Sequence, residues 1–360
     1  MKHKVIIHQL AFFAVTAVLF SLNISFGSTV ISPRAWFSAF SDTTHSDLFE
    51  ILWQFRLTKA VTCVLAGGAL AVGGLMMQTL FRNPLAGPDV LGLSSGASLL
   101  VALVLTLGNL GSSFLQQLSL NSWGLATAAT LGSSVVFLLL ISLSRIIRDN
   151  TSLLLTGLMV SATVSSVVGM LQFISQANDL QLFLIWSLGN VGGTNWKEIG
   201  ILFLLVLAGI SIFIAQVKSL NGRLLGDTYA KSLGIKLDRS RFWIVFATSM
   251  ITGGVTAFCG PIAFVGLAVP HFVRLMVPLS DHRQLLPLVL LGGSSLLLFC
   301  DWVAHLWGSL VLPLNVVTSL IGAQLVIWMI LKKKKVKLRS MQTEDLSIGY
   351  KIQGGRQFLF

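Results

Sequence analysis

Apolar runs of 18 or more residues constrain this chain most, because a run of that length can cross the hydrocarbon core of a bilayer as a helix. Several such runs recur along its 360 residues. Hydrophobic residues make up 54% of the chain and charged residues only 11%, against roughly 25% charged in a typical soluble domain. So few charges cannot cover a water-exposed surface. The sequence therefore predicts an all-α polytopic membrane protein.

The apolar stretches predict about ten transmembrane helices. They lie near residues 5–25, 57–79, 92–109, 122–144, 151–174, 197–217, 241–259, 261–277, 285–304 and 313–331. Near 20 residues, the first is long for the apolar part of a secretory signal, so we expect an uncleaved span rather than a signal peptide. We expect residues 1–331 to form the transmembrane domain and 332–360 a disordered, basic cytoplasmic tail.

The placement of lysine and arginine predicts the orientation. If both termini are cytoplasmic, 21 of the 25 basic residues lie inside, and only Arg34, Arg56, Lys59 and Lys197 lie outside. Such an excess on the cytoplasmic side is the rule for membrane proteins. The net charge of +12 is thereby explained by contact with a lipid membrane, and we expect no nucleic-acid partner.

Several patterns typical of catalysis or of bound cofactors are absent from the sequence. Cys63, Cys259 and Cys300 lie in or beside apolar segments without metal-ligand spacing, so we interpret them as packing residues. The phosphate-binding pattern G-x-x-x-x-G-K-[ST] is missing, and so is any clustered set of catalytic carboxylates. We expect no enzymatic activity, no metal and no cofactor in this chain.

Three stretches carry a resemblance to a known family. Residues 66–97 read AGGALAVGGLMMQTLFRNPLAGPDVLGLSSGA, residues 260–287 read GPIAFVGLAVPHFVRLMVPLSDHRQLLP, and residues 225–234 read LGDTYAKSLG. Together they resemble the iron–siderophore and vitamin B12 (FecCD-type) permease family of ABC importers, over nearly the whole chain from Ile31 to Gly322. The resemblance implies the bundle of a type II importer permease in the bacterial cytoplasmic (inner) membrane.

The resemblance also implies the partners and the cargo. These partners are a second permease subunit, identical or paralogous, two ATP-hydrolysing subunits and an extracytoplasmic substrate-binding protein. Iron(III)–siderophore is the commonest cargo of the family, so we expect it here, with haem or cobalamin as alternatives. The runner-up from another class is a proton-coupled secondary transporter. A membrane enzyme comes third, since no nucleophile, base or metal ligands cluster.

The second apolar segment predicts close helix packing and a sharp end. Glycine and alanine fill one face between residues 66 and 74, and small residues let helices approach closely in lipid. Arg82-Asn83-Pro84 follows, and proline with its preceding residue disfavours further helix. We interpret these residues as structural.

The segment 219–240 is predicted to be the one long cytoplasmic loop. Asp227 can cap a helix and Gly234 can end it in the left-handed conformation. The enclosed helix is too short to stand alone in water, which indicates that a partner holds it. The resemblance implies that this loop inserts into the ATPase subunit, with Gly226, Ala230 and Gly234 at the matching small positions.

The resemblance implies a docking site for the binding protein on the outer side. In the family, arginines at the positions of Arg56, Lys59 and His305 engage glutamates on that protein. Arg56 and Lys59 are three residues apart, so we expect one small basic patch. Lysine lacks the fork of a guanidinium and neutral histidine adds no charge, so we expect a weaker contact, mostly through Arg56. Anchoring of Arg56 at lipid headgroups is the alternative.

A few polar residues lie inside the predicted spans. Pro270 predicts a kink, and we interpret His271 beside it as structural rather than as a proton relay. Asp301 and His305 are four apart and share a helix face, so they could pair. The proton-coupled alternative would depend on His271, Asp301 and His305, because the sequence offers few other ionisable groups within the spans.

The fifth apolar segment carries a stripe of small residues at a spacing of four. Its members are Gly157, Ser161, Ser165 and Gly169. In the family the corresponding helix lines the translocation path between two permease subunits, and a smooth path suits large chelates. Tight helix packing explains the stripe equally well. Two departures from the family pattern, Thr58-Lys59 for Pro-Arg and Gln324 for Pro, leave the local geometry there open.

Overall fold

The chain is a bundle of helices. The computed structural model describes residues 2–27, 31–32, 36, 46–108, 115, 117–118, 122–147, 149–306, 311–329 and 331, and every regular element in these ranges is a helix. In chain order they are α1 (Lys2–Ser25), α3 (Ser46–Glu50), the π-helix η1 (Ile51–Leu57), α4 (Thr58–Phe81), the 3-10 helix η2 (Asp89–Leu91), α5 (Leu93–Gly108), α7 (Ser122–Ile146), α8 (Asn150–Ile174), α9 (Ala177–Ser187), α10 (Trp196–Leu224), α11 (Asp227–Ser232), α12 (Leu237–Cys259), α13 (Val265–Met276), α14 (His282–Ala304) and a final helix Leu314–Met329.

The lengths of these helices confirm a polytopic membrane protein. In the described part of the chain, seven helices are long and apolar enough to cross a membrane. Three shorter apolar helices accompany them, namely Leu93–Gly108, Val265–Met276 and Leu314–Met329. Each of the ten corresponds to one of the predicted segments. The predicted all-α bundle is therefore confirmed.

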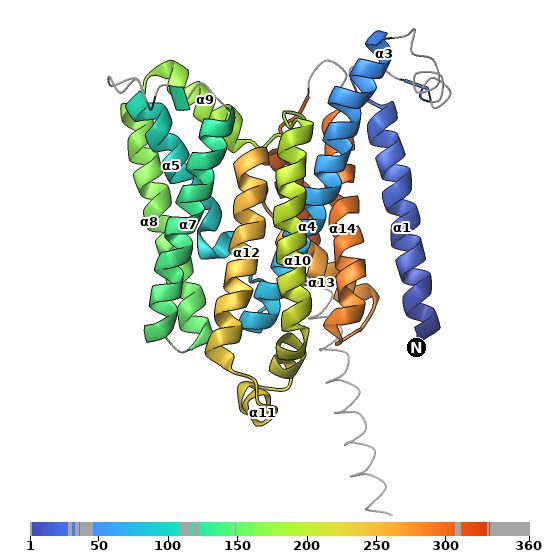
Figure 1. Cartoon of the computed structure of the whole chain (residues 1–360), viewed down its shortest axis with the longest axis vertical. Coiled ribbons are helices and arrows are strands. Elements are labelled where there is room, and N and C mark those ends of the chain that lie inside the picture. The colour runs from blue at the N-terminus through green and yellow to red at the C-terminus, as the bar shows by residue number, and fades with distance from the viewer. Residues whose placement is uncertain are drawn as a thin grey trace, which may run out of the picture.

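The bundle has two distinct ends (Figure 1). The start of α1 and the short helix α11 lie at one end, and α3 and α9 lie at the other. Most basic side chains of the described residues gather at the α11 end, among them Arg82, Arg223, Lys231, Lys236 and Arg239, whereas Arg56, Lys59 and Lys197 lie at the α3 end. By the positive-inside rule the α11 end faces the cytoplasm. Arg34 and the predicted tail 332–360 lie outside the described residues.

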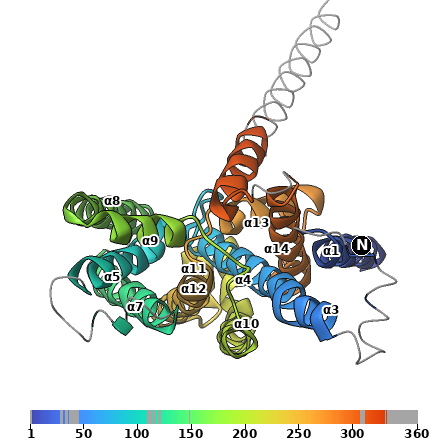
Figure 2. The ribbon, with the colours of Figure 1, turned by 90° about the horizontal axis from the view of Figure 1, so that it is seen from above.

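Helix α4 occupies the centre of the bundle (Figure 2). It packs against α10, α12, α13 and α14, and nearly all of its side chains are buried. Two glycines allow the closest approaches: a Cβ at Gly67 would overlap the carbonyl of Gly293 in α14, and one at Gly74 would overlap Gly266 in α13. Backbones this close leave no room for a side chain. The small-residue face is therefore a packing surface, as the sequence predicts.

The first helix is an integral part of the bundle. Helix α1 packs along α14, where the Asn23 side chain donates to the carbonyl of Leu298 at 2.8 Å and the Thr16 and Ser295 hydroxyls lie 2.8 Å apart. Hydrogen bonds of this kind hold helices together where water is absent. This packing agrees with the interpretation of the segment as a span.

One predicted boundary was wrong, and one helix was not predicted. The second segment was predicted to begin at residue 57, but the helix runs from Asp47 to Phe81 through the π-helical turns of η1. Thr58 continues that helix, and its backbone N–H donates to the carbonyl of Phe55, a bond that proline could not make. Helix α9, Ala177–Ser187, was not predicted, because its apolar run is shorter than a membrane span.

Candidate functional site

The cytoplasmic helix α11 sits on a shorter loop than predicted. Helix α10 continues to Leu224 and α12 begins at Leu237, so residues 225–236, not 219–240, form the connection. Gly226 and Gly234 flank α11 with φ angles of +115° and +76°, which glycine adopts without strain. Gly226 occupies the N-cap position and Asp227 is the first helical residue, so the predicted capping by Asp227 was wrong, whereas the left-handed Gly234 is confirmed.

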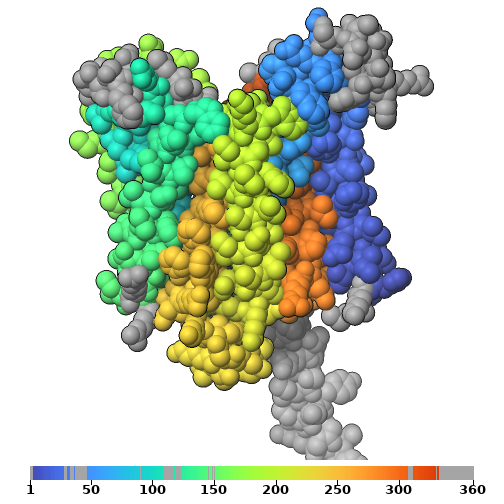
Figure 3. All heavy atoms as spheres, viewed as in Figure 1, coloured from blue at the N-terminus to red at the C-terminus, as the bar shows by residue number. Residues whose placement is uncertain are grey.

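One side of α11 is buried and the other is exposed. Ala230 is completely buried, and its Cβ lies close to Gly222 of α10. Leu225, Tyr229 and Leu233, by contrast, are exposed by 68%, 48% and 43%. Exposed apolar side chains at the water-facing end of a protein are available for contact with a partner. Ala230 was predicted from the sequence and these three residues were not, although their spacing of four along the chain is a visible signal. Figure 3 shows α11 projecting from the bundle.

The end of α4 is joined to α11 by charged side chains. As predicted, Arg82-Asn83-Pro84 ends α4, with Arg82 as the C-cap residue. Its guanidinium donates to the carboxylate of Asp227 at 2.6 Å and, through Nε, to the carbonyl of Arg223 at 3.1 Å. The buried guanidinium of Arg223 lies 3.8 Å from the same carboxylate and donates to the carbonyl of Leu237 at 2.8 Å. No pattern in the sequence indicated that this helix end meets α11.

A second contact at the cytoplasmic end joins α10 to α14. The Asp281 carboxylate accepts hydrogen bonds from the Asn221 side chain at 2.8 Å and from the backbone N–H of Arg283 at 3.0 Å. These bonds favour the charged carboxylate and hold the pKa of Asp281 below its ordinary value. Since this stability is present above the ordinary pKa of Asp281 and fades as pH falls through the lowered value, the contact persists at neutral pH.

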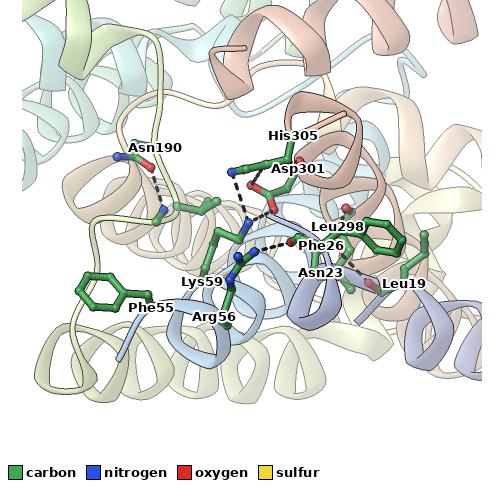
Figure 4. Close-up of polar contacts among 12 residues, drawn as sticks. Leu19, Asn23, Phe26, Phe55, Arg56, Lys59, Asn190, Leu298, Asp301 and His305 are labelled. Atoms are coloured by element: carbon green, nitrogen blue, oxygen red, sulfur yellow. Dashed lines mark hydrogen bonds and ion pairs between the residues drawn. The ribbon is translucent and has the colours of Figure 1, made fainter. Parts of the chain in front are cut away.

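At the opposite end of α4, the predicted docking residues gather around one carboxylate (Figure 4). The Lys59 ammonium lies 2.9 Å from the Asp301 carboxylate, and both side chains are buried. His305 Nδ1 lies 3.7 Å from that carboxylate, and His305 Nε2 lies 3.5 Å from Lys59 Nζ. The structure therefore brings Lys59 and His305 together. The sequence paired Asp301 with His305 only, whereas the shorter contact is with Lys59.

Arg56 belongs to the same region but faces another way. Its guanidinium donates to the carbonyl of Phe26 at 2.5 Å, and only 6% of the residue is exposed. Lys59 is exposed by 7%. The expectation that Arg56 and Lys59 form an exposed basic patch is therefore wrong for this conformation. Both cations lie beneath the surface because carbonyl and carboxylate oxygens of the same chain are available to them.

The small-residue stripe of α8 divides into two halves. Gly157 is buried, and Ser161 packs against α5, its hydroxyl 2.8 Å from that of Ser95. Ser165 and Gly169 instead face a crevice of about 310 Å³. Its described lining comprises Ser94, Ser95, Ser98, Ser165, Val168, Gly169, Gln172, Phe183 and Pro261. The stripe thus serves helix packing at one end, and at the other it lines a crevice whose described residues include no charged side chain.

Two further residues that were considered from the sequence, Pro270 and His271, lie in α13. Pro270 is inside this helix, as predicted, and has no N–H to continue the hydrogen-bond ladder. His271 beside it is half-buried.

Among the residues described, no three histidine, cysteine or acidic side chains come close enough to hold a metal ion. The cysteines Cys63, Cys259 and Cys300 are each buried as free thiols.

A comparison with protein families finds one match over most of the chain. Residues 15–332 match the model of the FecCD transport family. The vitamin B12 import system permease protein BtuC of Citrobacter koseri is 36% identical over 317 residues, covering 87% of this chain and 91% of the relative. The protein of the same name from Escherichia coli matches over 317 residues at the same identity and coverage.

Solved structures show the same architecture. A metal-chelate type ABC transporter in an inward-facing conformation superposes with a TM-score of 0.78 at 26% identity, covering 90% of this chain and 98% of that one. PsaBC from Streptococcus pneumoniae, solved in complex with Fab, superposes with a TM-score of 0.53 at 12% identity, covering 79% and 95%. The second likeness is one of fold alone.

Proposed function

The chain belongs to the FecCD transport family and is a multi-pass membrane permease of a bacterial ABC importer, and on that premise we propose that it carries iron(III)–siderophore complexes into the cytoplasm. The observation that supports import of a large metal chelate is the crevice lined by residues of α5, α8 and α9 and by Pro261. Among the described residues that line it, the hydrophilic ones are four serines and Gln172, and none of these side chains is charged. In a poorly hydrated wall a charged group would hold or repel a charged chelate strongly. Neutral hydroxyls let a bulky complex pass without being retained.

The crevice is one wall of the path and not a complete binding site. Its volume of about 310 Å³ is at the lower limit of pockets that enclose small molecules. A second permease subunit, identical or paralogous, would complete the path along α8. The exposed Ser165 and Gly169 on the open side of α8 support this arrangement.

Cobalamin is the second candidate cargo. The specific observation in its favour is the 36% identity to relatives that are named vitamin B12 import permeases. Both cargoes are large metal chelates, so the neutral crevice is compatible with either.

Competition in uptake separates the two cargoes. Cells that express the permease with its ATPase subunits and binding protein should accumulate radioactive iron supplied as a siderophore complex. An excess of the gallium complex of the same siderophore should suppress that uptake, and the same concentration of cobalamin should not. Suppression by cobalamin, together with uptake of labelled cobalamin, would instead establish the second candidate.

The coupling role belongs to α11. Two ATPase subunits would bind the projecting helices of two permeases through the exposed Leu225, Tyr229 and Leu233, whose apolar surface is otherwise in water. Gly226 and Gly234 allow the chain to turn sharply on either side of α11. Ala230 seats the helix on α10.

The docking role belongs to the cluster at the other end of α4. An extracytoplasmic binding protein would present carboxylates that compete with Asp301 for Lys59 and His305, and with the carbonyl of Phe26 for Arg56. Because the cations already have partners within the chain, docking exchanges existing contacts for new ones. This exchange favours a modest affinity, since the gain is a difference between two sets of contacts.

A further inference from the structure

Arg82 has a backbone conformation that an arginine seldom adopts. Its φ and ψ angles are 48° and 32°, in the left-handed region, which glycine enters freely and other residues do not. Among the described residues, Phe264 is the other non-glycine residue with a positive φ. A glycine would end α4 with less strain. The arginine side chain at this position therefore calls for an explanation beyond ending the helix.

The contacts of that side chain supply the explanation. The Arg82 guanidinium holds the Asp227 carboxylate at 2.6 Å and the carbonyl of Arg223 at 3.1 Å, so it meets both the first residue of α11 and the last turn of α10. Helix α11 otherwise packs against its sequence neighbours, α10 and α12. Arg82 thus connects α11 to α4, a helix far from it in the sequence.

Helix α4 extends from this contact to the opposite end of the bundle. It is a single buried helix from Thr58 to Phe81, and near its start Lys59 is ion-paired with Asp301 of α14. Thr62, one turn further on, lies 2.7 Å from the Thr194 hydroxyl before α10. An unbroken helix with a polar contact near each end is the physical connection through which a shift at the outer end would reach Asp227 at the inner end.

We propose that Arg82 is a positioning residue that couples movement of α4 to the cytoplasmic helix α11 through Asp227. The inference rests on the proposed coupling role of α11. The side chains of Arg82 and Asp227 are exposed by 42% and 39%. An exposed pair contributes little to the stability of a fold. Its loss therefore leaves the permease intact and changes how cargo binding and ATP hydrolysis are linked.

The test uses the complete importer in proteoliposomes, with binding protein and cargo outside. In Arg82→Gln and in Asp227→Asn, the stimulation of ATP hydrolysis by cargo-loaded binding protein should fall about fivefold or more, the size of a typical coupling between sites. The double variant should lose clearly less than the sum of the two single losses, because both changes break the contact between Arg82 and Asp227. Arg283→Gln, which removes an exposed arginine at the same end of the bundle, should match the unmodified protein.

Two outcomes would overturn the inference: stimulation in Arg82→Gln that equals that of Arg283→Gln, or losses that add in the double variant. A failure of the coupling role itself would look different. In that case Ala230→Trp, which displaces α11 directly, would also transport normally. If Ala230→Trp is inactive while Arg82→Gln behaves like the control, α11 couples the subunits without help from Arg82.

Discussion

Replacing Ala230 with tryptophan is expected to abolish uptake while the permease still inserts in the membrane. Ala230 is fully buried, and the neighbouring Gly222 and Ile235 leave no space for an indole ring. Overpacking of a well-packed site costs about 1–3 kcal/mol. A helix of six residues has no stability of its own to resist that cost, so α11 leaves its seat. The exposed Tyr229 and Leu233 would then no longer lie where the ATPase subunit can contact them.

Uptake of iron–siderophore by cells and co-purification of the ATPase subunits measure the effect. Ala230→Ser is the matched control, because a hydroxyl adds little volume, and it should transport nearly normally. Thermal unfolding of the purified permease shows whether the transmembrane bundle remains intact. Normal uptake by Ala230→Trp would mean that the position of α11 does not matter for transport.

Removal of Asp301 alone is expected to destabilise the permease strongly. In Asp301→Leu the buried Lys59 ammonium loses its partner at 2.9 Å, and breaking a buried ion pair from one side costs about 3–5 kcal/mol. Replacing both partners with apolar residues removes the unpaired charge, so the double variant Lys59→Met/Asp301→Leu should recover most of the stability. Thermal unfolding in detergent compares the stability of the unmodified permease, of Asp301→Leu and of the double variant.

The same variants test the docking role. If Lys59 engages the binding protein, the double variant should be stable and yet bind that protein more weakly. Lys197→Met removes another outer cation, one that is exposed on α10, and should change the free energy of unfolding by no more than about 0.5 kcal/mol. Unchanged affinity in the double variant would exclude Lys59 from docking. A single variant as stable as the unmodified chain would contradict the buried pair itself.

The fold could be predicted from the sequence because a segment that spans a lipid bilayer as a helix must be long and apolar. Length and hydropathy located all ten apolar segments, including the short one that contains Pro270. The boundaries were less accurate where a polar side chain finds a partner inside the protein. The predicted helix ended at residue 217, yet α10 continues to Leu224 and buries Arg223, because the Arg223 guanidinium bonds to the carbonyl of Leu237. Hydropathy counts such a residue as exposed and cannot see its partner.

The candidate sites were located only in part, because their contacts join distant parts of the chain. The spacing of four between Asp301 and His305 was visible in the sequence, whereas the pairing of Asp301 with Lys59, 242 residues earlier in the numbering, was not. The contact between Arg82 and Asp227 was hidden in the same way. Each of these residues was identified from its local sequence pattern, but which of them are in contact depends on the fold.

Import of cargo driven by ATP hydrolysis in partner subunits is the mechanism proposed for this permease. It is tested most directly in proteoliposomes that contain the permease and the ATPase subunits, with ATP enclosed and cargo-loaded binding protein outside. Uptake of iron–siderophore should require both ATP and binding protein and should continue when a protonophore abolishes any proton gradient. Uptake driven by a proton gradient without ATP would exclude ATP-driven import and would support a proton-coupled transporter.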